Sequence, residues 1–452
     1  MSFPRYPKYK PSGVEWLGDV PEHWSVSPLK VVATHNDEVL DESTDPEHEI
    51  LYVDISSVDG VSGISVKEPM PFANAPSRAR RRVRDGDVIV STVRTYLKAI
   101  ARICDPEPNL IVSTGFAVIR PRTTLVPHFL GHLLSASFFI EQVIARSSGV
   151  SYPAINASEL AAIPVLVPSE KEQTAIAAFL DRETLKIDSL VAEQRRLIEL
   201  LKEKRQAVIS HAVTKGLNPH APSKPSGIEW LGDVPEHWDV KSFQRCVSIA
   251  EGQVDPKVPG FSDMILIAPN HIESGTGQLL DLEVAAEQGA ISGKYFCKGG
   301  DVIYSKIRPA LRKVCIAPHD CLCSADMYPM HAHAGLTNEF LFRWILTEQF
   351  SAFAVLESNR VAMPKINRES LKEVRFAIPP IVEQQSICDF IASKTTEFDK
   401  LVTEAQRGIE LLQERRTALI SAAVTGKIDV RECERQGASR RFQDQSTTEV
   451  GA

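Results

Sequence analysis

Two stretches of the chain carry apolar residues at alternating spacings of three and four, the pattern of a helix that buries one narrow stripe. The first stripe consists of Ile187, Leu190, Gln194, Leu197, Leu201, Lys204 and Val208, and the second of Phe398, Leu401, Ala405, Gly408, Leu412, Arg415 and Leu419. The other faces are too charged for the inside of a globule. We therefore predict two long helices, over 169–216 and 380–428, that bury each other's stripes; an intermolecular coiled coil is the alternative.

Local signals mark where these helices begin and end. Ser169 and Glu172 have the spacing of a capping box after Pro168, whereas the second copy has Pro380, which is tolerated at a helix start. Gly408 interrupts the second stripe, either to let a partner backbone approach or to bend the helix. The polar residues 429–452 are predicted to be a disordered tail.

Short apolar runs predict strands in the remaining sequence. Ile-Val-Ser at 89–91 and Ile-Tyr-Ser at 303–305 each follow a Gly-Asp turn and read as buried strands. Asp87 recurs as Asp301, but its neighbour Asp85 is replaced by Gly299. A metal site made of paired aspartates is therefore not expected here.

The sequence contains an internal duplication. The sequence PSGVEWLGDVPEHW at 11–24 returns at 225–238 with a single change, Val14 to Ile228, a shift of 214 residues. GDVIVSTVRTYLKAIA at 86–101 aligns with 300–315 at the same shift, while YPAINASEL at 152–160 and the helix residues 193–214 recur 211 residues later, at 363–371 and 404–425. Each copy is a head motif, a body and a long helix. The bodies diverge most at 31–85 and 245–299, where two copies would differ if each read a different target.

The repeat sets the expected domain boundaries. They are a head motif at 1–27, a first body at 28–168, a first helix at 169–216, a linker with the second head at 217–240, a second body at 241–379, a second helix at 380–428 and the tail.

Composition narrows the class of protein. The 452 residues are too many for one ordinary core. No run of about 20 apolar residues predicts a membrane span, and the N-terminus has no signal-peptide core. Eight cysteines without framework spacing read as reduced thiols of a cytoplasmic protein. The net charge of −7 argues against indiscriminate coating of nucleic acid, although it permits a local basic surface.

Basic residues gather at matching places in the two bodies. Arg94 aligns with Arg308, and Lys98 with Arg312. Because the clusters recur in an acidic protein, we predict DNA-backbone contacts, with a solvated charged face as the alternative. The candidate residues in these clusters are Arg78, Arg80, Arg81, Arg82, Arg94, Lys98, Lys306, Arg308, Arg312 and Lys313.

A small, polar segment precedes a proline in each body. Residues 147–152 lead to Pro153, and residues 357–363 lead to Pro364. Such segments either approach DNA or are plain connectors. The further DNA-binding candidates that they supply are Ser151, Tyr152, Arg360 and Lys365.

Signatures of chemistry are weak in this sequence. The Pro-Pro at 379–380 lies between isoleucines rather than in an Asn/Asp-Pro-Pro-aromatic motif, and Gly275-Thr276-Gly277 lacks a third glycine. His331 and His333 alternate as strand residues do. No catalytic residue, metal ligand or cofactor of its own is predicted for the chain.

The head motif, the GDVI-x-S strand with its following arginine, the (Y/M)P-x-IN turn and the I-x-LL-x-E-(K/R)-R helix resemble specificity subunits of type I restriction–modification systems. The resemblance spans about residues 10–428. It implies an α+β fold with two target-recognition domains, related by a pseudo-twofold repeat and joined by two antiparallel helices. It also implies binding to a split site in double-stranded DNA, to two methylation subunits and to restriction subunits. Those partners would bring S-adenosylmethionine, ATP and Mg²⁺.

Two other classes remain open from the sequence. The chain could be the recognition part of a fused restriction–methylation enzyme, with the chemistry elsewhere. It could also be a paired-helix scaffold that does not bind DNA, although such a scaffold would not need the recurring basic clusters.

Overall fold

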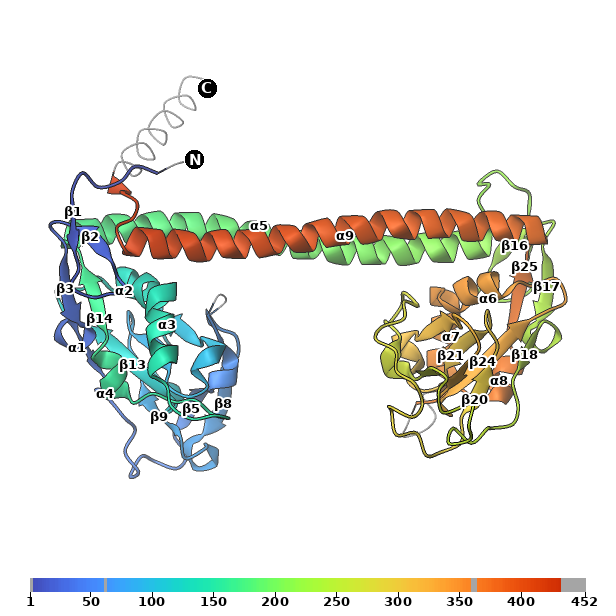
Figure 1. The fold of residues 1–452 in the computed structure, drawn as a ribbon, viewed down its shortest axis with the longest axis horizontal. Coiled ribbons are helices and arrows are strands. Elements are labelled where there is room, and N and C mark those ends of the chain that lie inside the picture. Colours follow the sequence, from blue (N-terminus) through green and yellow to red (C-terminus); the bar gives the residue numbers. More distant parts are fainter. Residues whose placement is uncertain (1–2, 61–62, 359–363, 432–452) are drawn as a thin grey trace, which may run out of the picture. The chain divides into compact units, whose positions relative to one another are not determined.

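A computed structural model describes residues 3–60, 63–358 and 364–431 (Figure 1). The chain divides into two compact units, unit 1 with Met1–Glu193 and Gly408–Ala452, and unit 2 with Gln194–Arg407. Two long helices, α5 (Glu170–Lys215) and α9 (Ile381–Val424), confirm the predicted pair. Because each unit contains one half of each long helix, the units cut across the linear boundaries expected from the repeat.

The body of unit 1 contains two four-stranded sheets, ordered β11-β10-β13-β4 and β8-β5-β12-β9. Its strands are β1 (Tyr9–Pro11), β2 (Asp19–Pro21), β3 (Ser25–Pro28), β4 (Ala33–His35), β5 (Glu49–Val53), β6 (Val58–Asp59), β7 (Gly63–Ile64), β8 (Glu68–Pro71), β9 (Ala79–Arg82), β10 (Val88–Ser91), β11 (Ile100–Arg102), β12 (Leu110–Ser113), β13 (Phe116–Pro121) and β14 (Pro164–Val167). Its short helices are α1 (Leu29–Val32), α2 (Pro127–Leu134), α3 (Ser137–Arg146) and α4 (Ala157–Ala161).

Unit 2 repeats this plan with sheets ordered β18-β24-β21-β22 and β19-β23-β20. Its strands are β15 (Ser223–Pro225), β16 (Asp233–Pro235), β17 (Asp239–Ser242), β18 (Val247–Ile249), β19 (Leu266–Ile267), β20 (Tyr295–Cys297), β21 (Val302–Ser305), β22 (Val314–Ile316), β23 (Cys321–Cys323), β24 (Met327–Ala332) and β25 (Arg375–Ile378). Its short helices are α6 (Asn338–Ile345), α7 (Glu348–Ser358) and α8 (Arg368–Lys372).

The predicted central strands are confirmed as β10 and β21, which are buried along their whole length. A Gly-Asp turn directly precedes each of these strands. The carboxylate of its aspartate contacts a side chain of the neighbouring strand of the sheet. Asp87 forms an ion pair with Arg120 at 2.8 Å, and Asp301 takes a hydrogen bond from His331 at 2.9 Å. The recurring aspartates, which the sequence placed in a turn before a buried strand, therefore also hold the neighbouring strand of the sheet.

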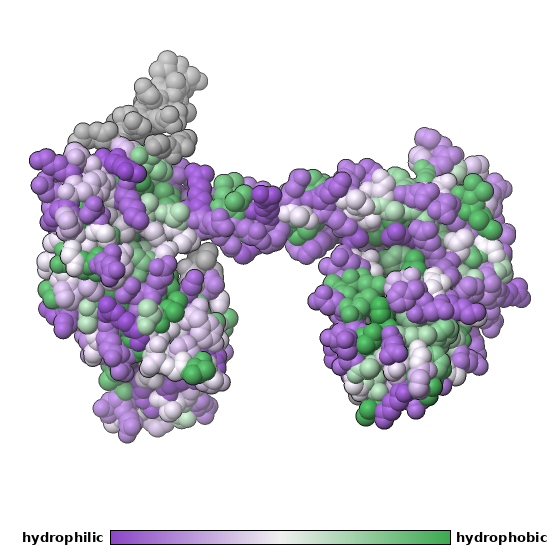
Figure 2. Space-filling view, viewed as in Figure 1, coloured by the Kyte–Doolittle hydropathy of each residue, from purple (hydrophilic) through white to green (hydrophobic). Residues whose placement is uncertain are grey.

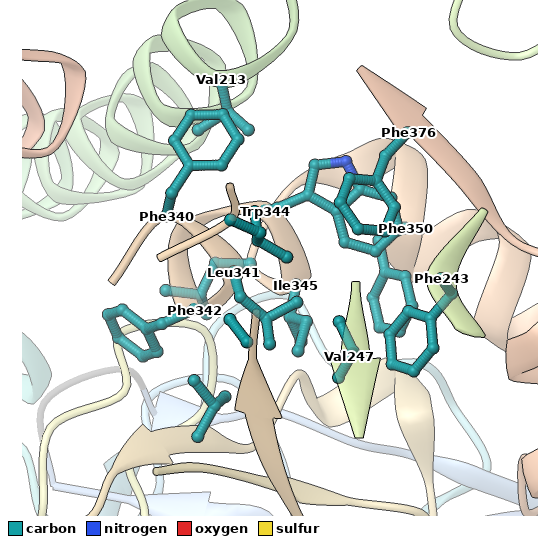
Figure 3. Close-up of a cluster of buried hydrophobic side chains, with 14 of the residues drawn as sticks. Val213, Phe243, Val247, Phe340, Leu341, Phe342, Trp344, Ile345, Phe350 and Phe376 are labelled. Carbon is teal, nitrogen blue, oxygen red and sulfur yellow. The ribbon is translucent and has the colours of Figure 1, made fainter. Parts of the chain in front are cut away.

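The core of unit 2 continues from the body into the long helices. Figure 3 shows Val213 of α5 facing Phe340 of α6, to one side of an aromatic group that includes Trp344, Phe350 and Phe376. The ring centroids of Trp344 and Phe376 lie 4.7 Å apart. Because body and helix share one apolar core, unit 2 is a single packing unit and not a body on a flexible connection.

Each head motif is fastened to the first turn of a long helix by a fully buried tryptophan. The indole Nε1 of Trp24 donates to Glu172 Oε1 at 3.4 Å, and that of Trp238 donates to Glu383 Oε1 at 3.1 Å. His237 Nε2 lies 2.6 Å from the other oxygen of Glu383. The two nearly identical heads are thus anchors for the body–helix junction.

The predicted capping box at the start of α5 is present in part. The carboxylate of Glu172 accepts from the Ser169 amide at 3.4 Å and from its hydroxyl at 2.9 Å. Although burial opposes it, hydrogen bonds from His23 and Ser169 lower the pKa of Glu172. The same side chain therefore caps the helix and holds the head.

Ion pairs show that the helix halves run antiparallel within each unit. In unit 1, the guanidinium of Arg416 donates two hydrogen bonds to the carboxylate of Asp188, at 2.9 and 3.3 Å. In unit 2, Arg205 lies 3.7 Å from Asp399, while Gly216, near the end of α5, approaches Glu383 at the start of α9. The helices therefore pair within the chain, as predicted in preference to an intermolecular coil.

The predicted stripe is wrong at three leucines. Leu190, Leu197 and Leu401 are 46%, 43% and 41% exposed, although they were expected to lie in the helix interface. Their following neighbours, Val191, Ile198 and Val402, are buried or half-buried instead. The other pairing candidates lie on the covered side: Ile187, Leu201, Val208, Phe398, Leu412 and Leu419 are buried or half-buried.

One expected role of Gly408 was to let a partner backbone approach closely, and the structure does not show such an approach. A methyl group built on it meets no atom within 4 Å. We expect Gly408→Ala to raise the free energy of unfolding by about 0.5–1 kcal/mol, because alanine loses less backbone entropy in a helix. Urea denaturation followed by circular dichroism checks this, and a destabilised variant would show that the glycine serves the packing.

No helix within the described residues is long and apolar enough to cross a membrane.

Candidate nucleic-acid interface

The same basic loop follows the central strand in both bodies. We call residues 92–98 loop A and residues 306–312 loop B; each contains one 3₁₀ turn, Thr95–Leu97 or Pro309–Leu311. The residues flanking each turn are left-handed, with φ values of 50° and 54° at Arg94 and Lys98, and 48° and 49° at Arg308 and Arg312.

Left-handed backbone at four cations requires an explanation. Among the described residues, seven non-glycine positions have positive φ, and these four are in that set. Each costs about 1 kcal/mol or more, and such conformations persist where surrounding structure enforces them, often at functional sites. Their recurrence at equivalent positions makes loops A and B the leading candidates for function.

Backbone hydrogen bonds close both loops in the same way. In loop A, the Ser91 amide donates to Ala99 O at 2.9 Å and the Leu97 amide to Arg94 O at 2.9 Å. In loop B, the Ser305 amide donates to Lys313 O at 2.9 Å and the Leu311 amide to Arg308 O at 2.9 Å. The cations are therefore held by a preformed frame.

The second repeated motif, the (Y/M)P-x-IN turn, packs against each loop. The Ile155 amide donates to Thr92 O at 2.9 Å, and the Ile366 amide donates to Lys306 O at 2.9 Å. In unit 2 the Arg308 amide also donates to Pro364 O at 2.9 Å. Two motifs that are far apart in the sequence thus form one surface in each unit.

The loop cations differ in what they contact. Arg94 and Lys98 are exposed, and the Arg94 guanidinium lies 4.8 Å from the ring centre of Tyr152, which is itself 65% exposed. Arg308 is exposed, whereas the half-buried Arg312 donates from Nε to Ser351 Oγ at 3.0 Å. Within the described chain, Arg94, Lys98 and Arg308 form no ion pair, so their charge is available to a ligand.

Several other predicted cations already have partners inside the protein. Arg78 pairs with Asp54 at 2.5 Å, and Arg80 lies over the Phe72 ring at 4.7 Å. Burial lowers the pKa of the half-buried Arg81, while Arg82 is exposed at the end of β9. The arginine run 78–82 is therefore less free for a ligand than its sequence suggests.

In unit 2, Lys306 donates to Ala325 O at 2.6 Å and Lys313 to Pro269 O at 2.6 Å. Lys365 is exposed beside loop B, as Ser151 is near loop A. Arg360 lies outside the described residues.

Sequence reasoning missed an apolar feature of these loops. Leu97 and Leu311 align at the shift of 214 and are 49% and 41% exposed, each directly before the second loop cation. The shared Arg-x-x-Leu-(Lys/Arg) pattern carried that signal.

Comparisons with known proteins agree with this duplicated arrangement. A family model described as "Type I restriction modification DNA specificity domain" matches residues 82–200 and 282–411. The EcoDI specificity subunit of a type I restriction enzyme from Escherichia coli is 31% identical over 304 residues, which is 64% of this chain and 68% of that protein. The putative MjaX specificity subunit of Methanocaldococcus jannaschii is 22% identical over 438 residues, covering 92% and 96% of the two chains.

Solved structures share the fold. A chain from a type I R-M system, studied for complex assembly and conformational transition, aligns with a TM-score of 0.66 at 23% identity, over 90% of this chain and 98% of that one. The HsdS subunit from Thermoanaerobacter tengcongensis aligns with a TM-score of 0.50, also at 23% identity and with the same coverage.

Proposed function

The chain belongs to the family of type I restriction–modification specificity subunits, and we propose that each unit reads one half of a bipartite double-stranded DNA site. The recurrence of the strained basic loop, as loop A in unit 1 and loop B in unit 2, is the observation that carries this proposal. A chain that reads two half-sites needs two like surfaces, and the repeat supplies them.

In this proposal the loop cations fix each unit on the DNA backbone. Arg94 and Lys98 in unit 1, and Arg308 and Arg312 in unit 2, bind phosphates and set the register. Bases are read by the divergent parts of the bodies, so the two half-sites differ. Ser151, Tyr152 and Lys365 are the candidates beside the loops for closer contacts to the DNA. Arg360, which lies outside the described residues, is a candidate from the sequence alone.

The long helices are proposed to dock two methylation subunits. Figure 2 shows apolar patches between hydrophilic residues on the surface of the helices. Leu190 and Leu401 align at the shift of 211, as do Leu200 and Leu411, and all four are more than 40% exposed. Each unit therefore offers the same pair of leucines, which fits two copies of one partner.

The chemistry is assigned to the partners. Methylation subunits would bring S-adenosylmethionine, and restriction subunits would bring ATP and Mg²⁺, while this chain supplies the specificity. We place the complex in the cytoplasm, a location supported by the seven described cysteines, which are all free thiols.

Replacing the loop cations should weaken binding to every DNA sequence alike. We expect Arg94→Ala with Lys98→Ala, and separately Arg308→Ala with Arg312→Ala, to reduce the slope of log affinity against log salt by about 0.9 per lost phosphate contact. Fluorescence anisotropy with labelled duplexes at several salt concentrations measures this. Lys202→Ala, on the exposed face of α5, is the matched control.

Unchanged affinity at low salt in both double variants would contradict the assignment of the loops. If the unaltered chain did not bind DNA even at low salt, the scaffold alternative would be favoured.

A further inference from the structure

An apolar hollow lies beside the paired helix ends of unit 2. It measures about 460 Å³, and the side chains that line it include Lys204, His211, Leu217 and Phe390. Phe390 is 38% exposed and Leu217 is 41% exposed. A concave site of this size with an exposed ring is a typical place for a ligand or a partner's side chain to bind.

The matching position in unit 1 is already covered. Phe179 aligns with Phe390 at the shift of 211, yet Phe179 is only 2% exposed. The ring of Phe3 stands edge-on against it, with centroids 5.5 Å apart and an interplanar angle of 88°. The guanidinium of Arg182 lies 5.6 Å from the same ring. The protein thus covers this phenylalanine with a second aromatic side chain from outside the helix pair.

Unit 2 lacks both covering groups. At the shift of 214 that relates the heads, residue 3 aligns with Leu217, and at the shift of 211, Arg182 aligns with Ser393. A leucine lines the hollow without closing it, since Phe390 remains exposed. Unit 2 therefore has the ring that unit 1 buries, but none of its described residues places an aromatic ring over it.

We infer that the hollow around Phe390 receives an aromatic side chain from a partner protein, on a segment that carries acidic residues. The aromatic part follows from the Phe3–Phe179 contact, which shows what this position accepts. The acidic part follows from charge, because the titratable side chains that line the hollow are Lys204 and His211. This docking site goes beyond DNA reading and does not depend on loops A and B.

Charge also argues against the chain's own tail as the occupant of the hollow. Its phenylalanine, Phe442, directly follows Arg440 and Arg441, which would bring like charge towards Lys204. A partner segment with carboxylates beside its aromatic ring meets the opposite condition.

The test uses the full chain and a peptide labelled at its N-terminus, fluorescein-Glu-Asp-Phe-Pro-Glu-amide, followed by anisotropy. Two comparison peptides replace the phenylalanine by alanine or the three acids by lysine. Leu217→Phe should close the hollow from within, as Phe3 does in unit 1, and Phe3→Ala should open the matching position over Phe179. Both changes are at the surface of folded units, and thermal unfolding of each variant checks that they remain folded.

We expect one acidic aromatic peptide to bind per chain, about tenfold or more tightly than the alanine peptide, which is the usual contribution of one buried aromatic side chain. Binding should be lost in Leu217→Phe, and Phe3→Ala should bind a second peptide. Equal binding of all three peptides, or unchanged binding in Leu217→Phe, would overturn the proposal. So would a dimer in light scattering that Leu217→Phe abolishes, since a second copy would then be the occupant. A gain in peptide affinity on removing residues 432–452 would assign the hollow to the tail instead.

Discussion

Inserting one heptad into both long helices is expected to lengthen the gap between the two half-sites by about three base pairs and to leave both half-sites unchanged. Seven helical residues add about 10 Å, and one base pair spans about 3.4 Å of the duplex. The insertions belong after Glu193 in α5 and after Arg407 in α9, because these are the boundaries between the two units. Each unit then keeps all of its internal contacts.

The physical reason is the period of the covered stripe. A seven-residue insertion preserves the alternation of three and four, so the buried side chains keep their layers. An insertion in α5 alone shifts Ile187 and Ile198 relative to one another without a matching shift in α9. That single-helix variant is expected to lose stability, and it serves as the control.

The methylated motif of a host that carries the lengthened chain and its methylation subunit is the measurement. An unchanged gap would show that the helices do not set the separation. Altered bases within either half-site would show that the helices also affect which bases are recognised.

Truncating Trp238 should largely unfold unit 2 while sparing unit 1. Its side chain is fully buried, and its indole satisfies the Glu383 carboxylate at 3.1 Å. Tryptophan-to-alanine changes in a core cost about 3–5 kcal/mol, a large share of the 5–15 kcal/mol by which domains are typically stable. Trp238→Phe keeps most of the apolar area and loses the hydrogen bond, so its cost should be smaller.

Hydrogen exchange followed by mass spectrometry resolves where the loss falls. Trp238→Ala should raise exchange across 194–407, and Trp24→Ala should do the same in unit 1, where Trp24 meets Glu172. Equal effects of each variant on both units would contradict the division into two packing units.

The repeat made the fold class accessible from the sequence alone. Matching stretches at shifts of 214 and 211 predicted two like bodies and two long helices, and the internal comparison identified the central strands β10 and β21. The two shifts also aligned Arg94 with Arg308 and Lys98 with Arg312, positions that turn out to share a left-handed backbone. What the comparison could not reveal is that backbone itself, because no glycine or asparagine marks it.

The helix stripe shows where pattern reasoning fails. The predicted stripe and the observed stripe share every seventh residue. Between two shared residues, the predicted stripe takes the third residue along the chain and the observed stripe takes the fourth. Spacing alone pointed to Leu190 and Leu197, although Val191 and Ile198 also fit an alternation of three and four. The structure buries the β-branched residues and leaves the leucines at the surface.

The basic clusters were over-counted for a different reason. Arg78 is neutralised by Asp54, and Lys313 is held by the carbonyl of Pro269, 44 residues earlier in the chain. Such partners come together only through the tertiary fold, so a count of cations in sequence overstates the charge that is free for DNA.

The most direct test of the account exchanges one body. Residues 241–379 would be replaced by the corresponding body of a relative with a different target, and the methylated motif of the host would be sequenced. If each unit reads one half-site, one half of the motif changes to that of the donor, while the other half and the gap stay the same. A motif that changes in both halves, or in neither, would contradict the claim that the two units read DNA independently.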